Sequence, residues 1–167
     1  YLEWMGKEAL KNWTEERILF EQNAIKNQLL YLGTSLNDVV QAQQRVTDAL
    51  LFVLRDARGQ WILADHQQAK SEWPLSLVDA QGQIRNFVVD RTFVDEQGVR
   101  WIIDYKTGLH QGGNLEAYLQ NKQEAHLGQL ENYATIFRAL EERPISMGLY
   151  FPFEGGWRAW QWAESPS

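Results

Sequence analysis

Cysteine is absent from the 167 residues of this chain. Its absence excludes disulfide bonds and thiolate metal sites, and it is typical of proteins from a reducing compartment such as the cytoplasm. The chain also lacks a long hydrophobic run, since the clearest one, at residues 49–54, is far too short to cross a bilayer. The N-terminal stretch is rich in charged side chains, so we expect neither a signal peptide there nor a membrane partner.

Positive charge is also in short supply. Lys and Arg number 16 against 22 Asp and Glu, and the net charge of −6 argues against a protein that coats nucleic acid, although a local basic patch remains compatible. The apolar content of 44% and the charged content of 23% are ordinary for a globular protein, and residues 1–167 suit a single domain. Because the sequence opens at Tyr1 without an initiator Met, we expect a piece of a longer polypeptide.

The N-terminal part has helical periodicity. Residues 1–32 predict a helix in two pieces, with Asn12 and Glu15 as a capping box at the break. Gly33 is a good stop for the second piece, and Ser35 is a good cap for the helix that follows it.

The period then changes to two, which predicts strands. The expected strands are residues 61–63, 71–79, 83–94, 99–106, 145–151 and 157–162. Residues 95–98 form a hairpin turn with Gly98 in its usual late position, and Pro74 marks an edge strand or an irregular entry. With a further helix at residues 115–142, the chain is predicted to be an α/β domain with a mostly antiparallel central sheet flanked by helices.

Two charges follow an apolar run at the end of the 99–106 strand. Asp104 and Lys106 need a partner there, because a buried charge is costly unless it is paired or bound to a metal. A tight 95–98 turn pairs residues whose numbers sum to 193 or 194, which puts Asp90 opposite Ile103 or Asp104. Side chains alternate along a strand, so Asp104 and Lys106 share a face and Tyr105 points the other way.

Asp90, Asp104 and Lys106 are therefore expected to converge. Two carboxylates at that separation repel each other unless a cation lies between them. Mg²⁺ binds one or two carboxylates together with water and phosphate oxygens. Lys106 would orient or deprotonate the attacking water, or offset charge in the transition state. This group of side chains suits the hydrolysis of phosphodiester bonds.

The motifs on these elements resemble a known family. Asp90 is followed by Arg91, then by D-Y-K-T-G at residues 104–108, and then by Gln129 and Tyr133 on the next predicted helix. D-x-K alone is a weak signal, but these motifs in this order are a fairly strong one. They are similar to the PD-(D/E)XK nuclease superfamily, and specifically to the RecB/AddA-type, exonuclease V-like nuclease domain at the C-terminus of recombination helicases.

The resemblance implies a restriction-endonuclease-like core and DNA cleavage that depends on Mg²⁺ or Mn²⁺. It implies that Asp90, Asp104 and the backbone carbonyl of Tyr105 hold the metal, while Lys106 serves the attacking water. Glu72 lies where such domains often carry a Glu. The implied partners are DNA, the helicase domain of the same polypeptide and, as an option, a partner subunit.

One feature departs from the family pattern. Such domains usually carry a histidine metal ligand on the first helix, whereas this sequence has only His66, His110 and His126. We expect the ligand to lie just before Tyr1, and its loss in evolution is the alternative. The three histidines present are more simply explained as solvated residues than as ligands.

Each candidate also has a simpler interpretation. Asp104 and Lys106 alone would be an exposed ion pair of little value. Gln129 and Tyr133 would be a polar helix flank, and Glu72 is equally consistent with a site and with the surface. Arg91 points away from Asp90 and is expected to brace a neighbouring element.

Two other functions remain open at this stage. The first is a catalytically inactive nuclease-like module that binds DNA or scaffolds a helicase complex. The missing histidine favours this alternative, and the intact Asp90, Asp104 and Lys106 argue against it. The second is an unrelated interaction domain, which would leave these three charges without a purpose.

Overall fold

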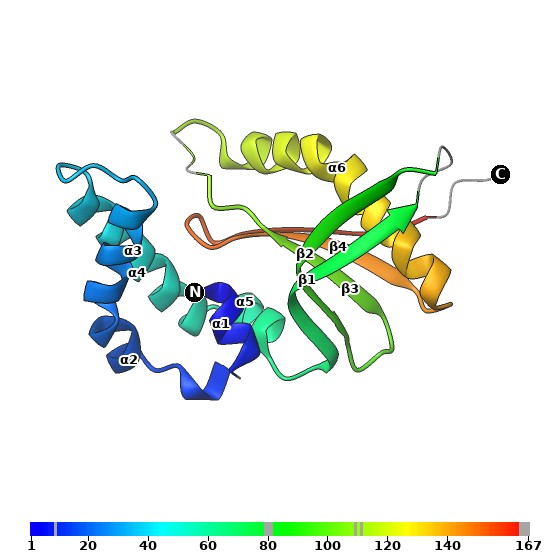
Figure 1. The fold of residues 1–167 in the computed structure, drawn as a ribbon, viewed down its shortest axis with the longest axis horizontal. Coiled ribbons are helices and arrows are strands. Elements are labelled where there is room, and N and C mark those ends of the chain that lie inside the picture. Colours follow the sequence, from blue (N-terminus) through cyan, green and yellow to red (C-terminus); the bar gives the residue numbers. More distant parts are fainter. Residues whose placement is uncertain (9, 79–81, 109, 111, 164–167) are drawn as a thin grey trace.

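The computed structural model describes residues 1–8, 10–78, 82–108, 110 and 112–163. It is an α/β fold built on a five-stranded sheet with the order β1-β2-β3-β4-β5, flanked by helices as the sequence predicted (Figure 1). Its elements are α1 (Leu2–Lys7), a 3₁₀ turn (Leu10–Asn12), α2 (Glu15–Phe20), α3 (Gln22–Tyr31), α4 (Val39–Arg55), α5 (Ala57–Leu63), β1 (Gln67–Val78), β2 (Ile84–Val94), β3 (Arg100–Tyr105), α6 (Leu115–Leu140), β4 (Ile145–Phe151) and β5 (Gly156–Gln161). Among the helices in these ranges, none is both long and apolar enough to span a bilayer.

The sheet is antiparallel except at one junction. β1, β2 and β3 form a meander, and β4 pairs antiparallel with β5. β3 and β4 run parallel and are joined through α6, as a crossover connection requires. The hairpin between β2 and β3 has the predicted turn, in which Gly98 adopts a φ of +79° that favours glycine. The predicted register is confirmed, because Arg91 pairs with Ile103 and Thr92 with Ile102.

Two hydrophobic cores lie on the two sides of the sheet. One core joins α6 to residues of β2, β3 and β4 such as Val89, Ile102 and Leu149. The other joins the N-terminal helices to Phe93 and Ile103. α6 therefore packs on one side of the sheet and the N-terminal helices on the other, which buries both faces of the central strands β3 and β4.

Two local predictions in the N-terminal half were wrong. Residues 61–63 belong to helix α5 and not to a strand, because Asp56 caps that helix by accepting a hydrogen bond from Gly59 N. The break near residue 13 is capped by Thr14, whose Oγ1 accepts from Arg17 N at 3.2 Å. Asn12 instead donates to the carbonyl of Glu8.

The remaining boundaries differ from the predictions by a few residues. Residues 1–32 form several short helical pieces and not two. β1 begins at residue 67, earlier than expected, and the last residue of the predicted 71–79 strand lies outside the described residues. Gly33 ends α3 with a φ of +95°, and Ser35 Oγ accepts from Asp38 N just before α4. Pro74 does lie in an edge strand, since β1 is the first strand of the sheet.

Candidate active site

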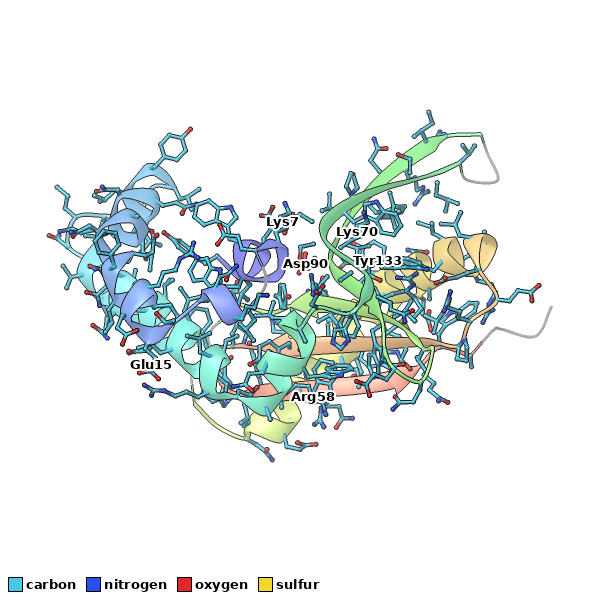
Figure 2. All side chains as sticks on the ribbon, turned by 90° about the horizontal axis from the view of Figure 1, so that it is seen from below. Lys7, Glu15, Arg58, Lys70, Asp90 and Tyr133 are labelled. Atoms are coloured by element: carbon cyan, nitrogen blue, oxygen red, sulfur yellow. The ribbon has the colours of Figure 1, made fainter. Side chains whose placement is uncertain are left out.

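The candidate site lies where two strands separate. The pairing of β2 with β3 ends at Arg91 and Ile103, whereas the pairing of β2 with β1 continues to the Val78–Ile84 pair. The β1–β2 hairpin therefore leaves β3 at Asp90 and projects past the other strands (Figure 1). Asp90 lies near the middle of the molecule, between the N-terminal helices and this hairpin (Figure 2).

Two further carboxylates act on Asp90 through their charge. Ser71 pairs with Arg91 and Trp73 with Val89, which brackets Glu72 and Asp90 on neighbouring strands. The negative charges of Asp104 and Glu72 both act on Asp90. Glu72 has a φ of +49°, an uncommon conformation for a residue other than glycine.

Asp90 carries opposing interactions. Its Oδ2 accepts a hydrogen bond of 2.8 Å from Tyr105 N, at the end of β3. Burial, followed by the negative charge of Asp104, raises the pKa of Asp90 to about 6, and Glu72 adds to this effect. The Tyr105 N–H and the charge of Lys106 oppose the shift without cancelling it. Near neutral pH the carboxyl group is ionised, although its burial and the nearby negative charges disfavour the ionised form.

Asp104 and Lys106 form an ion pair. Lys106 Nζ lies 2.5 Å from Asp104 Oδ2, and the Asp104 residue is only 6% exposed. Among the described residues, no group makes a hydrogen bond of regular geometry to this buried oxygen. The ion pair with Lys106 is therefore its polar contact. The pair is not the exposed one of the simpler interpretation, since both side chains are largely shielded from water.

Helix α6 contributes a connected set of polar side chains. His126 Nδ1 lies 3.1 Å from Lys106 Nζ and 3.4 Å from Gln129 Oε1. Gln129 Nε2 donates to Tyr133 Oη at 2.8 Å, and Tyr133 donates to the carbonyl of Val88 on β2 at 3.1 Å. Gln129 and Tyr133 therefore lie beside the predicted site, although their role in it stays a prediction. His126, which we expected to be solvated, is half-buried and lies between these side chains and Lys106.

Arg91 lies behind the site and is 1% exposed. Its guanidinium donates to the carbonyls of Ile62, Ala64 and Gly6 and to Ser71 Oγ, at 2.9–3.2 Å. These bonds connect β2 to the ends of α1 and α5 and to β1. The expectation that Arg91 braces a neighbouring element is therefore confirmed.

A cavity of about 590 Å³ opens next to the carboxylates. Glu72 and Asp90 line one part of it, and apolar side chains of α3 and α4 such as Leu29 and Leu50 line another. Tyr1 also lines this cavity. The site thus borders a hollow with a mixed acidic and apolar lining.

The other two histidines lie elsewhere. His66 stacks on Phe93 at 4.1 Å between ring centroids, and its Nε2 lies 2.6 Å from the Trp61 carbonyl. The His110 ring lies 4.8 Å from that of Tyr118. Within the described residues, no three His, Asp or Glu side chains come together closely enough to hold a metal ion.

The donor set nevertheless fits a hydrated divalent cation. Burial and then the negative charge of Asp104 raise the pKa of Asp90, so the two carboxylates repel each other in the absence of a cation. Mg²⁺ often uses only one or two carboxylates and keeps several of its water ligands. A cation between these two groups would relieve the repulsion that the fold imposes on them.

Comparison with known proteins adds no name to this arrangement. No protein-family model matches the chain, and no curated protein matches it either. What the chain can do is therefore inferred from its own side chains: two confined carboxylates and a shielded ammonium at the point where two strands separate.

Proposed function

We propose that this chain is a metal-dependent DNA nuclease domain that works with a helicase in the processing of DNA ends during recombination and repair. The proposal rests on the proximity of Asp90, Asp104 and Lys106. The Lys106 ammonium forms an ion pair with Asp104, and its charge also acts to lower the pKa of Asp90. The resemblance of the D-R, D-Y-K-T-G and Q-x-x-x-Y motifs to the PD-(D/E)XK nucleases supports the same reading.

Asp90 and Asp104 would hold the Mg²⁺ or Mn²⁺, and the family resemblance adds the carbonyl of Tyr105. When bound, the ion would polarise a phosphoryl oxygen and lower the pKa of a coordinated water. Asp90 contributes a partly buried anion close to a second negative charge, and a cation placed between the two would be attracted by both. Mn²⁺ would suit an incomplete ligand set better than Mg²⁺.

Lys106 would orient the attacking water or offset negative charge on the phosphate. An ammonium has three N–H donors, and the described structure directs one toward Asp104 and one toward His126. One N–H is left for the substrate or its water. A donor fixed in place before the reaction stabilises developing charge more effectively than a mobile one.

The supporting residues have separate tasks. Tyr133 connects α6 to β2 and, with Gln129, fixes the wall of the site next to Lys106. Glu72 adds negative charge at the cavity beside Asp90. Its proposed task is to hold water around the cation.

DNA would have to be delivered to this site. Phosphate contacts provide most of the non-specific affinity of proteins for DNA, and a chain with a net charge of −6 has little long-range attraction for a polyanion. A helicase domain in the same polypeptide, with or without a partner subunit, would supply the strand. We expect residues 1–167 alone to cleave feebly.

Cleavage of a labelled DNA oligonucleotide with Mn²⁺ and with Mg²⁺ tests the proposal. Wild type should release fragments only when one of the ions is present, and Asp104→Asn should not. Asp48→Asn, which makes the same change at an exposed position of α4, should match wild type. Metal-dependent DNA binding without cleavage would favour the inactive module, and a wild-type chain inert with both ions would contradict the nuclease.

A further inference from the structure

His126 occupies a position from which it contacts the proposed catalytic lysine. It lies on α6, three residues before Gln129 and seven before Tyr133, so the three side chains follow one stripe of the helix. Its Nδ1 is 3.1 Å from Lys106 Nζ. The lysine therefore has a neutral nitrogen on one side and the Asp104 carboxylate on the other.

The donors and acceptors along this stripe can be assigned by starting at Tyr133, the residue farthest from Lys106. A backbone carbonyl can only accept, so the Tyr133 hydroxyl donates to Val88 O. The Tyr133 oxygen then accepts from Gln129 Nε2, which orients the amide with Oε1 toward His126. The wall of α6 next to Lys106 thus presents acceptors.

The position of the proton on the neutral His126 ring can be inferred from its nearest partner, Lys106 Nζ. An ammonium has donors and no acceptor, so the contact of 3.1 Å requires a lone pair on His126 Nδ1. Gln129 Oε1 is farther from the same nitrogen, at 3.4 Å, and competes weakly for a proton there. The ring is therefore assigned as the neutral tautomer with its proton on Nε2.

We infer that His126 is a positioning residue that orients the Lys106 ammonium, which stays paired with Asp104, toward the substrate. This inference rests on the proposed nuclease function. The lysine stem is flexible and its ammonium is a compact point charge, so with Asp104 as its only partner it would be free to turn about that contact. A second acceptor on α6 fixes two of the three N–H groups, and with them the direction of the third, toward the attacking water.

Two substitutions at one position separate this role from packing. His126→Leu removes the acceptor and keeps a good helix former, whereas His126→Asn keeps a polar acceptor near the place of Nδ1. We expect kcat to fall about 10- to 100-fold in His126→Leu, as misplacement of a reacting group does, and to recover largely in His126→Asn. KM should stay within about twofold in both, because neither change touches bound DNA directly. Asn132→Leu, at an exposed position of the same helix, should match wild type.

A spectroscopic measurement gives a readout that does not depend on cleavage. Nitrogen NMR of the histidine rings should show His126 as the Nε2–H tautomer with Nδ1 accepting a hydrogen bond, and Lys106→Met should move the Nδ1 signal toward that of a free lone pair. A proton on Nδ1, or a signal unchanged in Lys106→Met, would overturn the inference and leave the nuclease standing.

The kinetic outcomes also distinguish the two claims. An active wild type whose His126→Leu variant is equally active overturns the role of His126 alone. The same holds if His126→Asn is no better than His126→Leu. A wild-type chain that cleaves no DNA with Mn²⁺ or Mg²⁺ overturns the nuclease and the positioning role together.

Discussion

Asp90 and Arg91 are neighbours on β2, and the protein treats their charges in opposite ways. Arg91 is buried with four hydrogen bonds to α1, α5 and β1, so its burial is compensated. Asp90 has one backbone donor and two nearby negative charges, and its pKa is raised to about 6. The charge of Arg91 is satisfied by the fold, and the charge of Asp90 is left in conflict, which is the pattern expected of a group that acts on a ligand.

The largest effect is expected on DNA cleavage, when a charged side chain next to Asp90 is removed. Lys106→Ala should lower cleavage about 100- to 10,000-fold, because it removes a positioned proton donor or base. It should spare metal binding, since an ammonium is never a metal ligand. Asp90→Ala should lose both cleavage and metal binding. Gel-based kinetics and Mn²⁺ titration measure the two properties, and a Lys106→Ala variant that cleaves like wild type would show that the role given to Lys106 is wrong.

The structural side of the comparison is tested at Arg91. Arg91→Met keeps much of the volume but leaves the carbonyls of Ile62, Ala64 and Gly6 without their donor. Buried unsatisfied groups are costly, so the free energy of unfolding should fall by about 3–5 kcal/mol in urea denaturation. Arg91→Lys should recover only part of the loss because its single ammonium cannot reach all of these carbonyls. Stability equal to that of wild type in Arg91→Met would remove the contrast between the two residues.

The raised pKa of Asp90 should make the free energy of unfolding depend on pH when divalent cations are absent. The pKa of this group rises from its ordinary 3.8 to about 6 on folding, so the folded chain binds the proton more tightly than the unfolded chain. The resulting stabilisation is complete below the unfolded pKa and is lost as the pH rises through about 6. Asp90→Asn should remove this dependence and raise the free energy of unfolding at about pH 8 by about 3 kcal/mol.

Denaturation with a chelator at several pH values measures that difference. Wild type and Asp90→Asn should converge below pH 3.8, where the carboxyl is protonated in both states, diverge as the pH rises from there to about 6, and differ by a constant amount above it. Curves that stay parallel over the whole range would mean that Asp90 is not under strain in the folded chain.

The smallest effect is expected from metal binding. Mn²⁺ or Mg²⁺ should raise the melting temperature of wild type by mass action, and modestly, because Mg²⁺ retains its waters and the side-chain ligands are few. Asp104→Asn should abolish the shift, and Asp48→Asn should keep it. Thermal scans at increasing ion concentration provide the measurement, and equal shifts in wild type and Asp104→Asn would eliminate the metal site.

The sequence predicted the β2–β3 hairpin well because its signals are local. The glycine at position 98, the alternation of apolar residues and the narrow choice of register together put Asp90 beside Asp104. The three apolar residues at 61–63 were assigned to the wrong class because so short a run has no detectable period. The Asp56 cap before them was the signal that identifies the helix.

The geometry of the candidate site was harder to predict from the sequence than the hairpin. That β2 leaves β3 at Asp90 depends on the twist of the whole sheet, which no local pattern encodes. The contact between His126 and Lys106 depends on where α6 crosses that sheet. A signal was nonetheless present, because positions 126, 129 and 133 form one helical stripe and two of them belonged to the recognised motif.

The contacts of the site differ in how much of the chain they span. The bond from Tyr105 N to Asp90 spans 15 residues within one hairpin, whereas the bond from Tyr133 to Val88 spans 45 and requires α6 to dock. Longer loops close at a greater entropic cost, so the α6 contacts require more of the chain to be ordered than the hairpin contact does. Lys106 has its second partner only when α6 is docked on the sheet. The arrangement proposed to cut DNA is thus available only to a chain whose long-range topology is already correct.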